Sequence, residues 1–432
     1  MPLRPPFFAL ATLAACVDPA ADGVQVAATL TPAAAVATVG TLTYTTEPAA
    51  RTQVRYGHGD VELIRPLEHT GAVAHEEVLV GLPGNTEAWW RIDDEAGAEL
   101  ASGTWSTGPV PAISPPTVVG NDAGAWITTT LLGSVYAAVV LSPRGEVVWY
   151  HFDESGLEPV RARPLPDGTG VVYTRGDLGG PDSAASAVVT VSWDGATVVE
   201  TPVPDLGQDF VVEGDGAVVA LAAETRAGTD GESVLGNALV RVETDGTWAR
   251  TWSTWDCFDP ALHPSNDPQL GWTWANALDE ADGDYLVGLR NLSSIVRVDG
   301  ESGGCGPIVG GDASEYTMVG DTWRHAHQFH RWDDRLLVFD NDGADGKSRA
   351  LELVLDDVQA TATTTWTYVP DTGAASFVLG DVARLADGST WVAFSLAGQM
   401  DRVAPDGSVD FRLNTALGTV FGYTTLADAP RP

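Results

Sequence analysis

The stretch AAVVLSPRGEVVWY (residues 137–150) decides the fold of this chain, because variants of it return five more times. Each copy is an apolar strand, a tight turn with Asp or Gly, and a second strand, which is typical of a β-hairpin. The turns recur at intervals of roughly 50–57 residues, the length expected for a propeller blade. The copies span residues 137–150, 187–200, 238–251, 294–311, 350–366 and 399–413.

A second, shorter hairpin signal lies between successive copies, as in PDGTGVVYT (166–174) and DDRLLVFD (333–340). Two hairpins per period make a four-stranded sheet, and such sheets must stack into a ring to cover both of their faces. The sequence therefore predicts an all-β fold with a six-bladed β-propeller over residues 119–432. We expect its ends to meet near Trp126–Thr129 and Gly422–Leu426, whereas a parallel β-helix would need a much shorter period.

Residues 23–109 are expected to form a separate β-sandwich, because short alternating segments are divided there by turn residues. The run VLVGLPGNTEAWWRI (78–92) resembles the Gly-Leu-x-Pro-x-Thr-x-Tyr stretch of fibronectin type III-like modules, with Ala88 where the tyrosine belongs. A spacer or docking role is the expectation for this unit. The proline-rich residues 110–118 are predicted to be an extended linker.

The charge of the chain restricts its partners. With 59 acidic and 23 basic residues the net charge is −36, which argues against nucleic acid and against an anionic membrane surface. Anionic substrates would need a local basic pocket that overrides this field. The acidic clusters at 279–284 and 340–345 are interpreted first as turns and second as calcium sites, and neither has the ligand spacing of an EF-hand loop. We predict no metal site and no cofactor.

The N-terminus reads as a processing signal. Arg4 provides a minimal positive region, Phe7–Leu13 a short apolar one, and Leu13-Ala14-Ala15-Cys16 closes it. This ending resembles the lipobox of bacterial lipoproteins, which implies cleavage before Cys16 and a lipid on its thiol. Val17 in place of Asp disfavours inner-membrane retention, so residues 1–22 predict an exported lipoprotein, tethered to the outer membrane. The alternative is an ordinary secretory signal.

Two cysteines remain in the exported chain, Cys257 and Cys305. They lie 48 residues apart, close to the repeat period, so neighbouring repeats are expected to bring them together as a disulfide. The alternative is two buried free thiols.

The segment HAHQFHRWDDRLLVFDNDGADGKSR (325–349) gathers three of the chain's eight histidines. If it runs as a strand, residues two apart share a face, so His325 and His327 converge while His330 faces away. Two imidazoles beside a loop with Lys347 and Arg349 suit attack on, or binding of, a small anionic group. The alternative is that these histidines cap a strand and titrate in solvent.

Three segments resemble the bacterial arylsulfotransferases (aryl-sulfate sulfotransferases). The first, WTWANALDEADGDYLVGLRNLSSIVRVD (272–299), is similar to a Trp-x-His-x-Asn motif that leads into an Asp-Gly-Asp turn and a strand ending in Arg. The second, HQFHRWDDRLLVFDND with SRALELVLD (327–342 and 348–356), resembles a histidine motif followed by Leu-Leu-Val-Phe-Asp-Asn-Gly and Ser-Arg. The third is GDVARLADGSTWVAF (380–394). The resemblance covers most of residues 119–430.

This resemblance implies a six-bladed propeller that moves a sulfuryl group from an aryl sulfate to a phenol, without a nucleotide donor. A neutral imidazole attacks sulfur, cations hold the sulfate oxygens, and a general acid/base serves the phenol oxygens. His327 matches the family histidine, and His325 is a candidate second imidazole. The remaining candidates are Arg290, Arg349 and Lys347 as cations, and Asn276 and Trp274 as substrate-binding residues.

The chain departs from the family pattern at several positions. Trp274 stands at the histidine position of the first motif, no histidine follows His330, and Ala326 and Gln328 replace the family's neighbours of His327. Two functions therefore remain open: an arylsulfotransferase acting on a small aryl sulfate and a phenol, and a non-catalytic, envelope-anchored propeller that binds a ligand or protein. Donor, acceptor, partner and oligomeric state are not specified by the sequence.

Overall fold

The computed structural model describes residues 23–65, 71–176, 185–228, 231–267, 271–343, 346–416 and 418–427, together with the two-residue strand β1 (Leu13–Ala14). The chain divides into two compact units, the first ending at Pro111 and the second beginning at Ala112. Within the part of the chain that is described, no helix is long and apolar enough to cross a membrane.

The first unit is a β-sandwich, as predicted. One sheet has the order β1-β2-β3-β6 and the other β5-β4-β7-β8. Alternate residues of each strand face the core, where Leu42, Tyr44, Trp90 and Trp105 are buried. Its strands are β2 (Gln25–Pro32), β3 (Gly40–Ala50), β4 (Thr52–His58), β5 (Val61–Ile64), β6 (Ala72–Leu79), β7 (Glu87–Asp94) and β8 (Glu99–Ser106).

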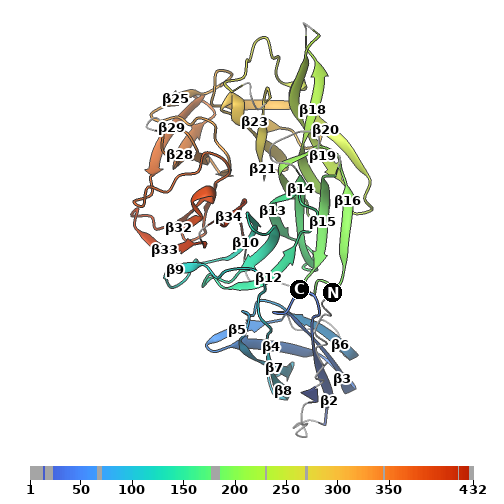
Figure 1. The fold of residues 1–432 in the computed structure, drawn as a ribbon. Coiled ribbons are helices and arrows are strands. Elements are labelled where there is room, and N and C mark those ends of the chain that lie inside the picture. Colours follow the sequence, from blue (N-terminus) through green and yellow to red (C-terminus); the bar gives the residue numbers. More distant parts are fainter. Residues whose placement is uncertain are drawn as a thin grey trace, which may run out of the picture. The chain divides into compact units, whose positions relative to one another are not determined.

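The second unit is a six-bladed β-propeller, confirming the interpretation of the repeats (Figure 1). Each blade is an antiparallel sheet, and the first strands of successive blades contact one another around the axis. From inner to outer strand, blade 2 is β13 (Glu158–Pro164), β14 (Gly170–Gly176), β15 (Ala187–Ser192) and β16 (Val198–Pro202). Blade 3 is β17 (Leu206–Val212), β18 (Val218–Ala227), β19 (Ser233–Val242) and β20 (Trp248–Ser253).

Blades 4 and 5 carry the family-like segments. Blade 4 is β21 (Ala275–Ala281), β22 (Asp284–Leu289), β23 (Ser294–Val298) and β24 (Cys305–Val309). Blade 5 is β26 (Phe329–Trp332), β27 (Arg335–Asp340), β28 (Arg349–Asp356) and β29 (Thr361–Tyr368), with β25 (Thr317–Val319) pairing in parallel at its outer edge.

Blades 1 and 6 are completed by both ends of the second unit. Blade 6 is β30 (Asp381–Arg384), β31 (Thr390–Phe394), β32 (Gln399–Val403), β33 (Val409–Asn414) and, outermost, β9 (Thr117–Gly120). Blade 1 is β10 (Trp126–Leu132), β11 (Ala137–Leu141) and β12 (Val147–Phe152), with β34 (Val420–Phe421) and β35 (Thr425–Ala427) pairing on its inner side.

The ring closes where the sequence predicted. Ile127 pairs with Leu426 and Thr128 with Thr425, so the C-terminal segment supplies the inner strand of blade 1. At the other end, Val118 pairs with Leu413. Residues 117–118 are therefore part of blade 6, and the extended linker is shorter than the predicted residues 110–118.

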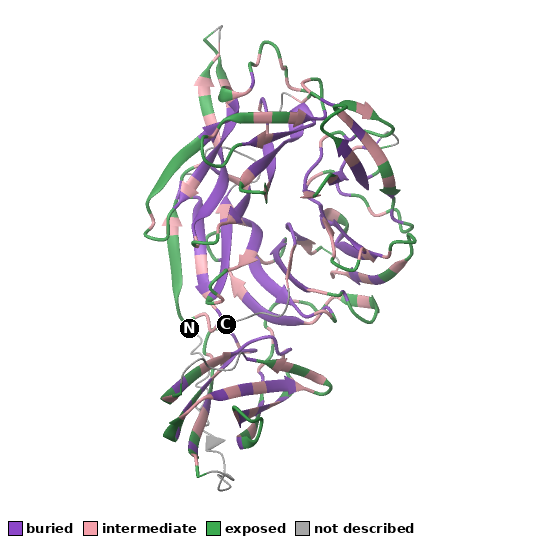
Figure 2. Cartoon of the chain, turned by 180° about the vertical axis from the view of Figure 1, so that it is seen from behind, coloured by how far each residue is buried: buried purple, intermediate pink, exposed green. Residues whose placement is uncertain are grey.

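Burial follows the strand order within the blades. Inner and middle strands are mostly buried, whereas β16 and much of β20 are exposed (Figure 2). The inner and middle strands pack apolar side chains against the neighbouring blade, as in the clusters shared by blades 3 and 4 and by blades 4 and 5. Because this burial lies between blades, the ring as a whole forms the core.

The predicted disulfide is present between Cys257 and Cys305, whose Cα atoms lie 5.7 Å apart. Cys257 follows the short 3-10 helix η1 (Thr254–Asp256) after blade 3, and Cys305 begins the outer strand of blade 4. The bridge therefore links adjacent repeats. Cys16, the predicted lipidation site, lies outside the described residues.

Candidate functional site

Most of the candidate side chains lie on connections at one end of the propeller axis, and Asn276 lies at the start of the inner strand β21. Neighbouring strands are antiparallel, so the connection between the second and third strands lies at the end where the inner strand begins. Arg290 is in the β22–β23 connection, within η3 (Arg290–Leu292), and Asn341 is in the β27–β28 connection. His325 and His327 precede the inner strand β26. We call Asn276, Arg290, His325, His327 and Asn341 the axial site.

His327 is held in one tautomer. Its side chain is 1% exposed, and Nδ1 lies 2.7 Å from Asn341 Oδ1. The amide nitrogen of Asn341 donates to the carbonyls of Ser376 (2.6 Å) and Leu379 (2.8 Å). Because both amide hydrogens are used, Oδ1 must accept, so the proton of His327 is on Nδ1. The lone pair is therefore on Nε2.

Burial also fixes the protonation state of His327. Loss of solvation lowers its pKa to about 3, while the hydrogen bond to Asn341 acts in the opposite direction. Arg290 and His325 lie close enough for their charges to lower this pKa further. At neutral pH the imidazole is therefore uncharged, which is the form a histidine nucleophile requires.

Three polar atoms next to His327 are buried without a hydrogen-bond partner among the described residues. They are Asn276 Oδ1, Arg290 Nε and His325 Nε2. The amide of Asn276 donates to the Ala326 carbonyl (3.0 Å), which fixes Asn276 beside the histidines. Buried polar atoms are nearly always paired in native proteins, so three unpaired ones in one place require an explanation such as a bound water, ion or ligand.

His325 reaches the site through a backbone turn. Its φ is 51°, and its N–H donates to Ser293 Oγ at 3.3 Å. The expectation that His325 and His327 share one face of a strand is therefore wrong, because β26 begins only at Phe329. A left-handed conformation is unusual for histidine, and such outliers concentrate at functional sites. Burial lowers the pKa of His325, with the charge of Arg290 acting in the same direction.

Trp274 lies beside the axial site. It precedes β21, has φ 44° and is half-buried. Its carbonyl accepts the backbone N–H of Arg290 at 3.1 Å. The structure thus brings both predicted substrate-binding residues, Trp274 and Asn276, close to Arg290 and the histidines.

Arg349 is bound to groups outside the axial site, and Lys347 lies in the same connection as Asn341. Arg349 Nε donates to Asp340 (2.9 Å), while its other nitrogens contact Asp321 (3.0 Å) and the Thr322 carbonyl (2.9 Å). Through these bonds the guanidinium connects the segment before Arg324 with the end of β27. Lys347 is exposed in the β27–β28 connection. The guanidinium of Arg349 is therefore occupied by other groups, whereas the role expected for Lys347 stays a prediction.

His330 is directed away from the axial site, as expected. Its Nδ1 accepts the backbone N–H of Arg384 in blade 6 at 2.9 Å, and its ring packs beside Trp332. Burial lowers its pKa, and the charge of Asp279 opposes that shift. The three histidines of the segment therefore have two separate environments.

The sequence did not indicate the polar network that crosses the axis. Arg161 Nε lies 3.1 Å from Asp209, and its Nη2 lies 2.8 Å from Asp381. Gln328 donates to the second oxygen of Asp209 at 2.7 Å. These residues come from blades 2, 3, 6 and 5, so one arginine and two carboxylates join opposite sides of the ring.

Tyr423 and Thr424 extend this network to the remaining blades. The Tyr423 hydroxyl donates to the Asn276 carbonyl in blade 4 at 2.8 Å, and the Thr424 N–H donates to Asp381 at 2.6 Å. Burial raises the pKa of Asp381, and the charge of Arg161 opposes the shift. The network links the inner strands across the axis, and Gln328 and Asn276 connect it to the axial site.

Within the described residues, no group of three or more His, Cys, Asp or Glu side chains is arranged to hold a metal ion. The axial site consists of imidazole, guanidinium and amide groups, with Asp267 at 3.4 Å from Arg290 Nη1 and Asp342 at 3.7 Å from His325 Nδ1. These groups suit an oxyanion and a nucleophilic or hydrogen-bonding histidine.

The fold and site define a six-bladed β-propeller protein with a polar axial site. No family model and no curated protein matches the chain. A protein of unknown function from Bacteroides caccae is similar in structure, with 11% identity, a TM-score of 0.44, and coverage of 70% of this chain and 99% of that chain. A functionally unknown protein from Desulfotomaculum acetoxidans has 11% identity and a TM-score of 0.45, covering 79% and 96%. The Cps50 (Swd1) β-propeller domain from Myceliophteria thermophila has 12% identity and a TM-score of 0.42, covering 69% and 86%.

Proposed function

We propose that the axial site transfers a sulfuryl group from an aryl sulfate to a phenolic acceptor through His327, as the resemblance to the arylsulfotransferases implies. The observation that carries the proposal is the state of His327, whose neutral ring contacts Asn341 through Nδ1 and lies near enough to Arg290 for that charge to lower its pKa.

In the first half-reaction, Nε2 of His327 forms a bond to sulfur as the sulfur–oxygen bond to the aryl group breaks. The electron pair leaves on the phenolate oxygen. The modified ring becomes positively charged and keeps its proton on Nδ1, where Asn341 Oδ1 stabilises it. In the second half-reaction, a phenol oxygen attacks sulfur, and the electron pair of the nitrogen–sulfur bond returns to His327.

The other axial residues have separate roles in this scheme. The guanidinium of Arg290 faces the non-bridging sulfate oxygens. His325, whose pKa is lowered by burial, is the neutral base that takes the acceptor's proton and later releases it to solvent. Asn276 and Trp274 position the aryl sulfate, Trp274 through its aromatic ring and Asn276 through the amide oxygen that has no partner in the described structure.

A second candidate function is non-catalytic binding of a small anion at the same site. The observation that favours it is the engagement of Arg349 by Asp321, Asp340 and the Thr322 carbonyl, which leaves Arg290 without the second cation expected there. In that case the propeller presents a ligand or protein site at the cell envelope, anchored through Cys16.

Turnover of a chromogenic aryl sulfate with a phenol acceptor tests the proposal. We expect wild-type protein to release the chromophore in an acceptor-dependent way, and His327→Ala to be inactive. His330→Ala is the matched control, because His330 lies in a separate environment, and it is expected to retain activity. Wild-type protein that binds the aryl sulfate without turnover would favour the second candidate.

The same proposal includes export and lipidation of the chain. Mass spectrometry of protein purified from native membranes is expected to find an N-terminal Cys16 that carries lipid. An N-terminus that retains residues 1–15 without lipid would contradict this part.

A further inference from the structure

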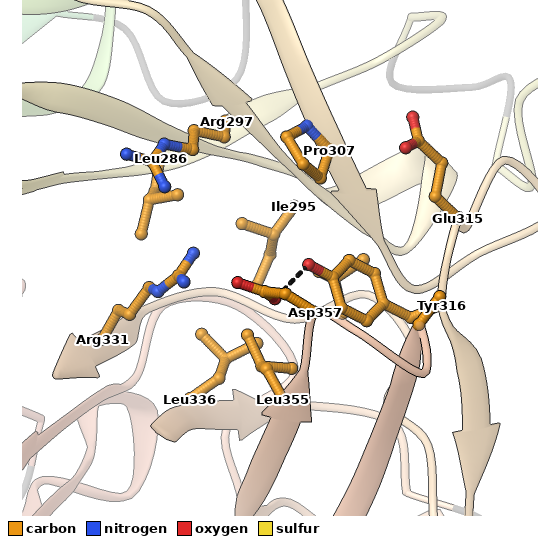
Figure 3. A pocket seen from close by; sticks show the side chains of 12 residues that line it. Leu286, Ile295, Arg297, Pro307, Glu315, Tyr316, Arg331, Leu336, Leu355 and Asp357 are labelled. Atoms are coloured by element: carbon orange, nitrogen blue, oxygen red, sulfur yellow. Dashed lines mark hydrogen bonds between the residues drawn. The ribbon is translucent and has the colours of Figure 1, made fainter. Parts of the chain in front are cut away.

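A cavity of about 240 Å³ opens between blades 4 and 5 (Figure 3). None of the axial-site residues lines it, so it is a separate feature. Its lining is mainly apolar, and most of these side chains belong to the core that joins the two blades. The apolar residues that form it are Leu286, Ile295, Pro307, Val309, Leu336 and Leu355.

Among the polar groups that line this cavity, some have a hydrogen-bond or ion-pair partner in the described part of the chain and the Arg331 guanidinium does not. Arg297 pairs with Asp284, and the Tyr316 hydroxyl donates to Asp357 at 2.6 Å. Arg331, near the far end of β26, projects toward the cavity, as Figure 3 shows. Its charge acts on Tyr316, but its guanidinium makes no hydrogen bond or ion pair with any described residue. In a chain with 59 acidic and 23 basic residues, a partly buried arginine without a carboxylate partner is unexpected.

The size of the cavity limits its occupant. An apolar cavity of about 150 Å³ holds a benzene molecule, so about 240 Å³ accommodates one ring and a short substituent. The apolar lining suits the ring, and Arg331 suits a carboxylate, to which arginine binds through two parallel hydrogen bonds. Glu315 and Asp357 on the remaining wall disfavour a second negative charge on the ligand.

We propose that this inter-blade cavity binds a small organic monoanion, an apolar ring with one carboxylate, and that Arg331 holds the carboxylate. The site is independent of the axial site and of the transfer reaction proposed there.

Calorimetric titration with phenylacetate, and with phenylacetamide as its neutral counterpart, tests this proposal. We expect phenylacetate to bind in 1:1 stoichiometry with a dissociation constant of about 1 mM or lower. This affinity lies within the maximum binding free energy per non-hydrogen atom that small ligands reach. Phenylacetamide and the Arg331→Gln variant should each weaken binding by about tenfold or more, because a hydrogen-bonded charge is lost.

Two control variants make the result specific. Arg250→Gln removes one positive charge, as Arg331→Gln does, but on β20 of blade 3, where Arg250 pairs with Glu224. This variant should bind phenylacetate as wild type does. Arg290→Gln distinguishes the axial site, because loss of binding in that variant would move the ligand there and overturn the proposal. Equal affinity for phenylacetamide, unchanged binding by Arg331→Gln, or no binding by wild type would also overturn it. Circular dichroism and melting curves verify that each variant is folded.

Discussion

At the scale of single residues, the chemistry of the site depends on Asn341. Both amide hydrogens of this short side chain are donated to backbone carbonyls in the connection that leads to blade 6. Its oxygen therefore accepts the hydrogen bond from His327. A neutral histidine with a fixed tautomer is the result. The same burial that keeps His327 neutral has a cost at low pH, because the folded state resists protonation that the unfolded chain accepts.

That cost predicts a pH-dependent stability. The pKa of His327 is lowered to about 3 in the folded state from an ordinary value near 6.5, so stability is fully present above about pH 6.5 and falls as the pH drops toward 3. The loss from this one group should reach about 1.4 kcal/mol per pH unit well below pH 6.5. Urea unfolding at pH 7.5, 5.5 and 4.5 measures this loss of unfolding free energy. The His327→Gln variant should lose less stability per pH unit than wild type, because it lacks this group. Parallel pH profiles for the two proteins would contradict the prediction.

At the scale of secondary-structure elements, the inner strands carry one polar network. Arg161 in β13 neutralises Asp209 in β17 and Asp381 in β30, and all three side chains are buried. Buried charges are tolerated only when they are paired and hydrogen-bonded. Arg161 is therefore the cation that contacts both of these buried carboxylates directly.

Replacing Arg161 should be strongly destabilising. Arg161→Met leaves two carboxylates buried without their cation, which costs about 3–5 kcal/mol. The exposed pair of Arg250 with Glu224 is the matched control, and Arg250→Met should cost about 1 kcal/mol or less. Urea denaturation of both variants gives the comparison, and similar unfolding free energies would refute the assigned role.

The sequence specified these elements better than it specified the site. The hairpins were predictable because Asp-Gly turns and apolar runs are local signals that recur with a fixed period. Arg290 and Arg349 look equivalent in the sequence. Only the fold shows that Arg349 is bound by Asp321 and Asp340, and that Arg290 contacts Asp267 and Asn291 through a single nitrogen. The partnership of Arg161 with Asp381 spans the ring, and no local pattern indicates it.

At the scale of the whole molecule, the propeller is closed at several points. The C-terminal strands pair with β10, β9 pairs with β33, and the disulfide joins the end of blade 3 to the outer strand of blade 4. Each of these contacts links segments that belong to different blades or distant parts of the chain. Stability in a ring of this kind is therefore distributed over the contacts between repeats.

The disulfide makes a measurable contribution to that stability. Its 48-residue separation corresponds to about 4 kcal/mol by the chain-entropy relation, and the usual range is about 2–4 kcal/mol. The double variant Cys257→Ser/Cys305→Ser should lose stability within that range in urea denaturation. A variant as stable as wild type would contradict a structural role for the bridge.

The central claim is that His327 attacks sulfur, and direct detection of the modified histidine tests it. Wild-type protein incubated with an aryl sulfate without acceptor, then digested at alkaline pH for mass spectrometry, should carry a sulfuryl group on His327. The label should disappear when a phenol is added, and it should not form in His327→Ala, while His330→Ala should be labelled like wild type. Wild-type protein that binds the aryl sulfate and carries no label on His327 would contradict the catalytic account.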